Sequence, residues 1–232
     1  MSMKKLSVLA AAVIFSLALV VLVPLVALES VAFSPSFYHS QFERLDRPEE
    51  TGFSEAELMQ ASQALWEYFR GQRETPQLKL KRNDKETMLY GQRELDHLVD
   101  VKKLFQQGMA ARTTALLLVI LAGAYLLLHR QSGLRLAAKG TLGAAGLVLL
   151  LISLTLVLLS IDFNRWFTLF HLISFSNDLW QLDPSRENLI RIFPEPFFFA
   201  AARTALIRTA ITFLALLTGS LILLSRLPSQ NN

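Results

Sequence analysis

The chain has 232 residues, of which 52% are hydrophobic, and its mean hydropathy of +0.37 is higher than a soluble domain of this size needs. It contains no cysteine, which excludes structural disulfides, thiolate nucleophiles and cysteine-ligated metals. The formal net charge of +4 is spread along the sequence and indicates no nucleic-acid partner.

Four apolar runs predict membrane-spanning helices, which typically need about 18–25 such residues. They cover residues 6–28, 113–128, 140–161 and about 197–224. The second run is the shortest and would need residues from its N-terminal side. The first follows Lys4 and Lys5, as in a signal peptide, but it is longer than a typical signal and lacks a small-residue cleavage site before Glu29. We interpret it as a retained anchor, with a cleaved signal as the alternative.

The basic residues predict the orientation of these helices. Lys4, Lys5, the segment 129–139 and Arg226 would share one side of the membrane, which makes that side cytoplasmic. The fold class expected is a mainly α membrane protein with four transmembrane helices and a small α+β extracytoplasmic cap. Its expected parts are a tail and first membrane helix over residues 1–28, the cap over 29–112, the second membrane helix over 113–130, a cytoplasmic loop over 131–139, the third membrane helix over 140–161, an extracytoplasmic aromatic-rich loop over 162–196, the fourth membrane helix over 197–225, and a cytoplasmic tail over 226–232.

The segment between the first two spans reads as an ordered cap. Ser54 and Glu57 form a capping box that opens a helix over residues 54–70, whose apolar residues recur at helical spacing. Residues 77–90 alternate around Asn83-Asp84, which predicts a hairpin. A second helix is expected to begin near Gln92.

The second extracytoplasmic segment is rich in aromatic residues. An interfacial aromatic belt accounts for some of them, but polar side chains are interleaved among the rings. Asp183 followed by Pro184 predicts the start of a short helix that continues through residues 188–193. We expect the rings to wall an apolar substrate pocket, with Trp166, Phe167, Phe170, Phe175 and Trp180 as its members.

Two histidines stand out, because an imidazole exchanges protons near neutral pH. His97 has Glu94 and Asp100 three residues away on either side, so both acids share its helix face. His171 lies in the aromatic segment. The alternatives are a solvated helix for His97 and an interfacial histidine for His171. His129 is interpreted as a flank at the cytoplasmic end of a membrane helix, and His39 as a bystander.

Polar neighbours of the two histidines are the expected supporting residues. Glu94, Asp100, Asn177 and Asp178 would orient an imidazole or stabilise an oxyanion, with surface solvation or local capping as the alternative. The spacing Glu94-x-x-His97 also occurs in di-iron bundles, but a second copy is missing, so no metal is expected. Serine-nucleophile, phosphate-loop and zinc-protease motifs are missing as well.

At these residues the chain resembles the bacterial lipoprotein intramolecular transacylase family. The resemblance is carried by ALESVAFSPSFY, TGFSEAELMQ, RELDHLVDVKKLF, FTLFHLISFSNDLWQLDP and NLIRIFPEPFFF. It implies a multi-pass enzyme of the bacterial cytoplasmic membrane with an extracytoplasmic active site and no cofactor. The implied reaction moves the sn-2 acyl chain of an S-diacylglyceryl-cysteine lipoprotein to the cysteine α-amine, giving the lyso form. The implied catalytic residues are His97 and His171, one of them a general base.

Two alternatives stay open at this point. The first is a non-enzymatic membrane protein that binds lipoproteins or lipids, as a chaperone or a sensor does. The second is another acyl chemistry, such as transfer from a membrane lipid to a protein amine. The residues also leave open which histidine is the base. The partners expected are a diacylated lipoprotein and membrane lipids.

Overall fold

The computed structural model describes residues 2–82 and 85–228, and these form two compact units. The first unit comprises the described residues of Met1–Glu29, Met109–Val157 and Thr204–Asn232. The second, which we call the cap unit, comprises Ser30–Gly108 and Leu158–Arg203 without residues 83 and 84.

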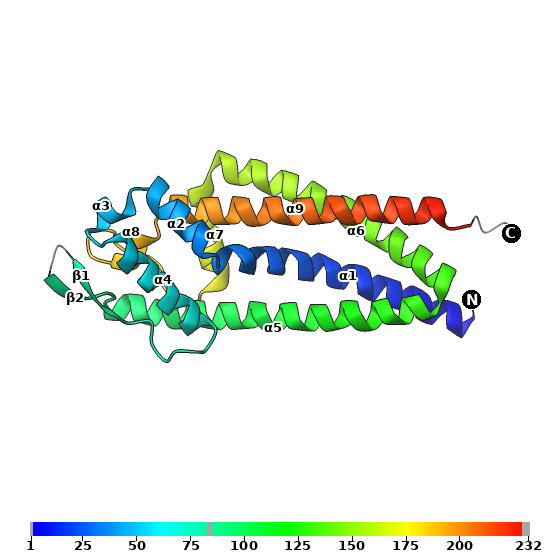
Figure 1. The fold of residues 1–232 in the computed structure, drawn as a ribbon, viewed down its shortest axis with the longest axis horizontal. Helices are drawn as coiled ribbons and strands as arrows, with labels where there is room; N and C mark the ends of the chain where they lie inside the picture. The colour runs from blue at the N-terminus through cyan, green and yellow to red at the C-terminus, as the bar shows by residue number, and fades with distance from the viewer. Residues whose placement is uncertain (1, 83–84, 229–232) are drawn as a thin grey trace. The chain divides into compact units, whose positions relative to one another are not determined.

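Among the described residues, four helices are long and apolar enough to cross a membrane. They are α1 (Met3–Ala32), α5 (Gln92–Leu128), α6 (Arg130–Ile161) and α9 (Glu195–Arg226), labelled in Figure 1. Their apolar stretches expose large side chains such as Leu121 and Leu150, each 67% exposed. Such an outer surface suits lipid rather than water as the solvent.

The first unit is packed through small residues, as is usual between membrane helices. Gly140 of α6 lies against α1, where an added Cβ would stand 2.3 Å from the hydroxyl of Ser16. Phe213 of α9 is fully buried beside Ala145 and Val148 of α6. An ion pair between Glu29 and Arg112 joins α1 to α5 next to the ends of their apolar stretches. Close helix contacts and one charge pair therefore organise this unit.

The cap unit is built from short elements. They are α2 (Pro35–Arg44), α3 (Arg47–Thr51), α4 (Glu55–Phe69), β1 (Lys79–Arg82), β2 (Lys85–Met88), α7 (Phe163–Ser174) and α8 (Asn188–Ile192) (Figure 1). The predicted hairpin is confirmed, with β1 antiparallel to β2 and Lys79 opposite Met88. Its expected turn at Asn83-Asp84 lies outside the described residues. The capping box of Ser54 and Glu57 is also confirmed at the start of α4.

An aromatic core holds the cap unit together. Phe42, Phe53 and Leu58 are at most 1% exposed, and burying side chains of this size stabilises a fold by about 1.5–3 kcal/mol each. The Tyr38 ring lies 5.0 Å from the rings of Trp66 and Phe197, measured between centroids. Helices α2 and α4 and the first turn of α9 therefore share one core.

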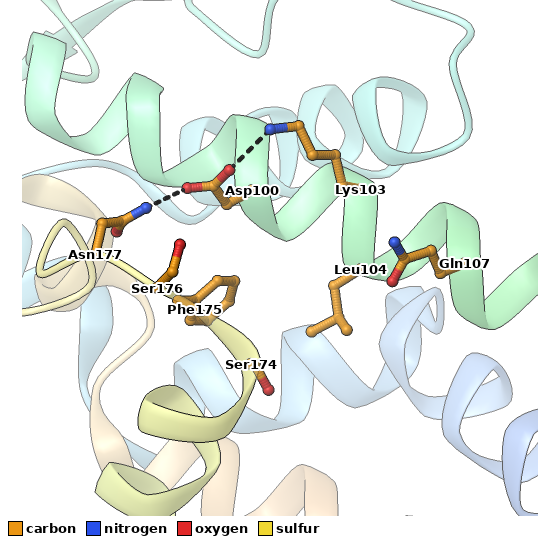
Figure 2. Close-up of a pocket in the computed structure, with 8 residues that line it drawn as sticks. All are labelled: Asp100, Lys103, Leu104, Gln107, Ser174, Phe175, Ser176 and Asn177. Carbon is orange, nitrogen blue, oxygen red and sulfur yellow. Dashed lines mark hydrogen bonds and ion pairs between the residues drawn. The ribbon is translucent and has the colours of Figure 1, made fainter.

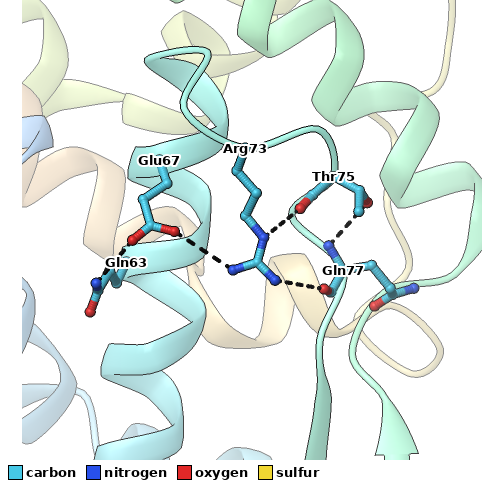
Figure 3. Close-up of polar contacts among 5 residues, drawn as sticks. All are labelled: Gln63, Glu67, Arg73, Thr75 and Gln77. Atoms are coloured by element: carbon cyan, nitrogen blue, oxygen red, sulfur yellow. Dashed lines mark hydrogen bonds and ion pairs between the residues drawn. The ribbon is translucent and has the colours of Figure 1, made fainter.

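The connection between α4 and β1 is ordered by polar contacts (Figure 3). The guanidinium of Arg73 donates to the carbonyls of Thr75 (2.8 Å) and Gln77 (3.3 Å) and lies 3.7 Å from the carboxylate of Glu67. The amide of Gln77 in turn holds the backbone of Tyr90 at both its N–H (3.0 Å) and its carbonyl (2.6 Å). This clamp fixes the chain directly before α5.

Two boundaries differ from the expectations. The expected limit between residues 112 and 113 falls inside α5, which is one continuous helix, since a single glycine at 108 does not terminate a helix. The short helix expected from Asp183 begins only at Asn188. Asp183 instead closes a local turn, in which its carboxylate accepts the N–H of Ser185 at 2.8 Å. Helix α7 lies within the segment 162–196 that was expected to be an aromatic-rich loop.

Candidate active site

The two predicted histidines lie side by side within the cap unit. His97 projects from α5 and His171 from α7, and their ring centroids are 6.3 Å apart. The two residues are only 6% and 7% exposed. Two imidazoles that are far apart in the sequence therefore form one buried pair, which we call the two-histidine site.

Hydrogen bonding fixes the tautomer of His171. Its Nδ1 lies 2.6 Å from the carbonyl oxygen of Phe167, one turn earlier in α7. A carbonyl oxygen only accepts, so Nδ1 carries the proton of the neutral ring. The lone pair of His171 is therefore on Nε2, the nitrogen available to take a proton from a ligand.

His97 has an unused nitrogen. Its Nδ1 is buried and has no hydrogen-bond partner among the described residues. A buried polar atom without a partner is costly, and such atoms in native proteins usually mark a place for water or a ligand. This nitrogen is a second polar contact point in the two-histidine site.

Burial keeps both imidazoles neutral near pH 7. Residues 92–108 of α5 and all of α7 lie outside the apolar runs of the chain. Desolvation lowers the pKa of His97 from 6.5 to about 4 and also lowers the pKa of His171. The cause is that a charged imidazolium loses more hydration free energy than a neutral imidazole does when it leaves water. The neighbouring His171 depresses the pKa of His97 further, whereas Asp100 opposes the shift.

Aromatic rings enclose the pair. Phe167, Phe170 and Trp180 contact the His171 ring at centroid distances of 4.4, 5.2 and 4.8 Å, with Trp180 stacked on it. Phe175 touches both imidazoles, at 5.1 Å from His97 and 5.7 Å from His171. Trp166 makes no ring contact with either histidine in the described part of the chain. Four of the five expected aromatic residues therefore surround the site directly.

Glu94 takes a different place from the one expected. Its two carboxylate oxygens accept the backbone N–H groups of Gly91 and Leu189, each at 2.6 Å, and it has no hydrogen bond to His97. Gly91 directly precedes α5 and Leu189 is the second residue of α8, so one carboxylate caps two helix starts. Burial raises the pKa of this carboxyl, against the opposing effect of the backbone N–H groups. Glu94 therefore fixes the first turn of the helix that carries His97.

The loop after α7 is tied to α5 by the other predicted residues. Asn177 donates its amide N–H to Asp100 at 2.8 Å, and Lys103 donates to the second oxygen of Asp100 at 3.0 Å (Figure 2). These two hydrogen bonds hold the pKa of Asp100 below its usual value. Arg93 donates to the backbone carbonyl of Asp178 and lies 3.7 Å from its carboxylate.

Arg93 and Lys103 were missed by the sequence analysis. The signal was present, since the two residues lie four before His97 and three after Asp100 on one helix. Their partners in the loop are far away in sequence, and spacing along one helix does not reveal such contacts.

A pocket of about 160 Å³ lies next to the two-histidine site, and Figure 2 shows the residues that line it. It is lined by Asp100, Lys103, Leu104, Gln107, Ser174, Phe175, Ser176 and Asn177. Phe175 is common to this pocket and to the contacts of both imidazoles. Within the described ranges, no group of three or more His, Asp or Glu side chains is placed to hold a metal ion.

Known solved structures share this fold. The membrane integral lipoprotein intramolecular transacylase Lit from Bacillus cereus matches with a TM-score of 0.75 at 21% identity, over 94% of this chain and 95% of that one. A histidine-to-arginine variant of the same protein matches with a TM-score of 0.75 at 20% identity, over 96% and 94% of the two chains. Its histidine-to-alanine variant matches with a TM-score of 0.73 at 20% identity, over 96% of each.

The family model described as lipoprotein intramolecular transacylase Lit matches residues 12–198, whereas no curated protein matches the sequence significantly. The match includes both histidine segments and extends over most of the chain. The resemblance stated from the residues is thereby confirmed, and nothing supports the non-enzymatic alternative. The chain belongs to the lipoprotein intramolecular transacylase family, and it is accordingly an acyltransferase and a multi-pass bacterial membrane protein.

Proposed function

We propose that His97 and His171 together catalyse the family's reaction on a diacylated lipoprotein. In this reaction the sn-2 acyl chain of an S-diacylglyceryl cysteine moves to the α-amine of the same cysteine. The products are a new amide and a free sn-2 hydroxyl, which is the lyso form. The observation that carries the proposal is the buried pair of neutral imidazoles with ring centroids 6.3 Å apart.

His171 is the general base in this proposal. An α-amine with a pKa of about 8 is mostly protonated at neutral pH, and its nitrogen must be free of the extra proton before it attacks an ester. The Nε2 of His171 carries the lone pair, because Nδ1 donates to the carbonyl of Phe167. When Nε2 takes a proton, this hydrogen bond becomes charge-assisted and stabilises the imidazolium.

His97 is the electrophilic partner. A ring whose pKa is about 4 is a weak base, but in its neutral form it still has an N–H to donate. A neutral imidazole that donates to a developing oxyanion is an established means of stabilising such a charge. His97 would therefore polarise the ester carbonyl and hold the oxyanion of the tetrahedral intermediate.

The transfer balances without an acyl-enzyme or a cofactor. The amine nitrogen forms a bond to the sn-2 carbonyl carbon, and the bond from that carbon to the glycerol oxygen breaks. The ammonium group first loses its extra proton to solvent. His171 then takes a second proton from the attacking amine nitrogen and returns it to the departing glycerol oxygen. Nucleophile and ester belong to one molecule, so much of the acceleration comes from holding both ends in a cyclic geometry.

The aromatic residues would keep water out of this cycle. Phe167, Phe170, Phe175 and Trp180 contact the imidazoles, and a dry site suppresses hydrolysis of the ester. Trp166 lies on the same helix α7 and would contact a part of the substrate that is further from the histidines. We place the site on the extracytoplasmic face, because the basic residues at Lys4, Lys5, 129–139 and Arg226 favour the cytoplasm for the opposite ends of the spans.

The test uses purified protein in detergent and a synthetic S-diacylglyceryl-cysteine peptide. We expect His97→Ala and His171→Ala each to lower kcat by about 10²–10⁴-fold, the range for a lost acid or base. The matched control is His39→Ala, which removes an exposed histidine paired with Glu55 and should keep full activity.

Mass spectrometry identifies the transfer. An intramolecular reaction leaves the mass and the number of acyl chains unchanged and moves one chain to the amine. A product heavier by one acyl chain would identify a transfer from another lipid instead. Full activity in either His97→Ala or His171→Ala would remove that residue from the mechanism.

A further inference from the structure

A polar pocket borders the two-histidine site, and the proposed transfer does not use it. One wall is a face of α5 with Asp100, Lys103, Leu104 and Gln107, and the other is the segment from Ser174 to Asn177 at the end of α7 (Figure 2). Both walls belong to the cap unit. The pocket therefore lies beside the chemistry on the two elements that carry the histidines.

The lining offers hydrogen-bonding groups that the fold itself leaves unused. The carboxylate of Asp100 is occupied by Asn177 and Lys103. In contrast, the side chains of Gln107, Ser174 and Ser176 make no hydrogen bond within the described part of the chain. One amide and two hydroxyls provide both donors and acceptors in a small space. Such a lining suits a ligand with alternating donors and acceptors.

The charge of the pocket argues against an anionic ligand. Its one cation, Lys103, is 3.0 Å from the carboxylate of Asp100, so the pair is close to neutral. A lipid phosphate would meet an already neutralised lysine beside a carboxylate. The polar lining also gives acyl chains little apolar surface, since only Leu104 and Phe175 are apolar. The lining therefore fits a ligand that is neutral, polar and extended.

Phe175 sets the position of this ligand relative to the reaction. Its ring lines the pocket and touches both imidazoles. The His171 ring is also in contact with Phe167, Phe170 and Trp180, whose apolar rings suit the lipid part of a substrate. A substrate that reacts between the histidines would thus have both an aromatic surface and a polar pocket next to it.

We infer that this pocket binds the polypeptide backbone of the lipoprotein immediately after the lipidated cysteine. An extended chain advances about 3.3–3.6 Å per residue, so a pocket next to the reacting amine would receive the first two or three residues. Gln107 and Ser176 would bind main-chain N–H and carbonyl groups, which are the same for every lipoprotein. The inference rests on the proposed function, because it takes the cysteine amine to react at the histidines.

The experiment compares substrates of different length. S-Diacylglyceryl-cysteine amide is compared with peptides that carry one, two, three and five further residues, using wild-type enzyme in detergent. We expect kcat/KM to rise by about 3- to 10-fold per added hydrogen-bonded residue and to level off at the third, mainly through KM. In the double variant Gln107→Ala/Ser176→Ala, the ratio of kcat/KM between the longest and shortest substrate should fall toward 1.

The control variant is Gln63→Ala. Gln63 is an exposed amide on α4 that bonds to Glu67, and its loss should leave the length dependence as in wild type (Figure 3). A wild-type kcat/KM that does not change with peptide length would overturn the inference, and so would a double variant that keeps the wild-type ratio. These outcomes differ from a failure of the proposed function, in which no substrate of any length is converted or in which activity survives without His97 and His171.

Discussion

The two halves of the two-histidine site are held in different ways. The His97 half is part of the cap core: the next residue, Leu98, is 2% exposed, and Glu94 fixes the helix start with two backbone hydrogen bonds. The His171 half lies on the short helix α7, whose outer side is apolar and exposed. The exposed residues there are Leu169, Phe170, Leu172 and Ile173, at 41, 48, 62 and 78%.

This difference separates the roles of the two helices. A core-anchored helix keeps its histidine in a fixed place, and an amphipathic helix of this composition is typical of a membrane surface. Polar contacts from the following loop to Asp100 and Arg93 connect the second half to the first. We therefore expect changes in the first half to act mainly on stability, and changes in the loop contacts to act mainly on the geometry of the pair.

The largest expected effect tests the rigid half. Glu94→Ala leaves two buried backbone N–H groups without an acceptor, which should lower the free energy of unfolding by about 2–4 kcal/mol. Thermal and denaturant unfolding in detergent would measure this loss. Glu67→Ala is the control, because the carboxylate of Glu67 is partly exposed and bonds only to the side chains of Gln63 and Arg73. This substitution should lower the free energy of unfolding by less than about 1 kcal/mol. An equal effect of the two variants would show that the double cap does not anchor the His97 half.

Glu94 also illustrates which features of the structure can be predicted from the sequence. The four spans and the capping box at Ser54 are visible in it because they depend on local composition and on spacings of three or four residues. For Glu94, however, the same spacing fitted both an imidazole partner and a helix cap. The second bond, from Leu189, comes from a residue far along the chain, and no local pattern contains that information.

The pairing of the histidines has a similar lesson. Each histidine segment could be singled out by its interleaved polar and aromatic residues, and the family resemblance joined the two. The tautomer of His171 and the unused Nδ1 of His97 required coordinates, since they depend on the carbonyl of Phe167 and on burial. The continuity of α5 was missed because the sequence analysis separated the cap helix from the membrane span where the side chains change from polar to apolar. Such a change does not terminate a helix.

The next effect is the pH dependence of the pair. The pKa of His97 is about 4 in the folded protein and near 6.5 when unfolded, and that of His171 is also lowered. The unfolded state then binds more protons between these values, so the stability contributed by the neutral rings is complete above about pH 6.5 and is lost as the pH falls toward 4. For His97 the loss amounts to at most about 3 kcal/mol.

Activity and stability should follow this titration together. We expect the acid limb of the kcat/KM profile to lie below pH 6.5, the ordinary value for histidine, and the rate to rise on the alkaline side as the substrate amine with pKa about 8 loses its proton. Unfolding measured from pH 4.5 to 7 should show a shallower slope in His97→Gln than in wild type. A second loss of rate that sets in above pH 6.5, in addition to the protonation of the substrate amine, would mean that the imidazoles are not desolvated as the structure has them.

A smaller effect is expected from the loop contact between Asp100 and Asn177. Their hydrogen bond is charge-assisted but partly exposed, so a double-mutant cycle of Asp100→Ala and Asn177→Ala should give a coupling of about 0.5–1.5 kcal/mol. The bond links the two halves of the site. Each single variant should therefore lower kcat by about 3- to 30-fold, which is more than the loss of folded protein accounts for. A coupling near zero in kcat would mean that the apolar contacts of α7 alone position His171.

The smallest effect belongs to Asp178, and it separates the side chain from the backbone. The Asp178 carboxylate is 75% exposed and 3.7 Å from Arg93, and an ion pair of this kind stabilises by about 0–0.5 kcal/mol. Its backbone carbonyl, in contrast, accepts a hydrogen bond from the same guanidinium. Asp178→Asn should therefore leave the unfolding equilibrium constant and kcat within about twofold of wild type, while Arg93→Ala, which removes both contacts, should lower kcat by more.

The salt dependence separates the two contacts. Measured at low and at high salt, the effect of Arg93→Ala should persist, because a hydrogen bond to a carbonyl is screened less than a surface ion pair. If Asp178→Asn were as harmful as Arg93→Ala and salt erased both effects, the loop would be held by charge and not by the backbone.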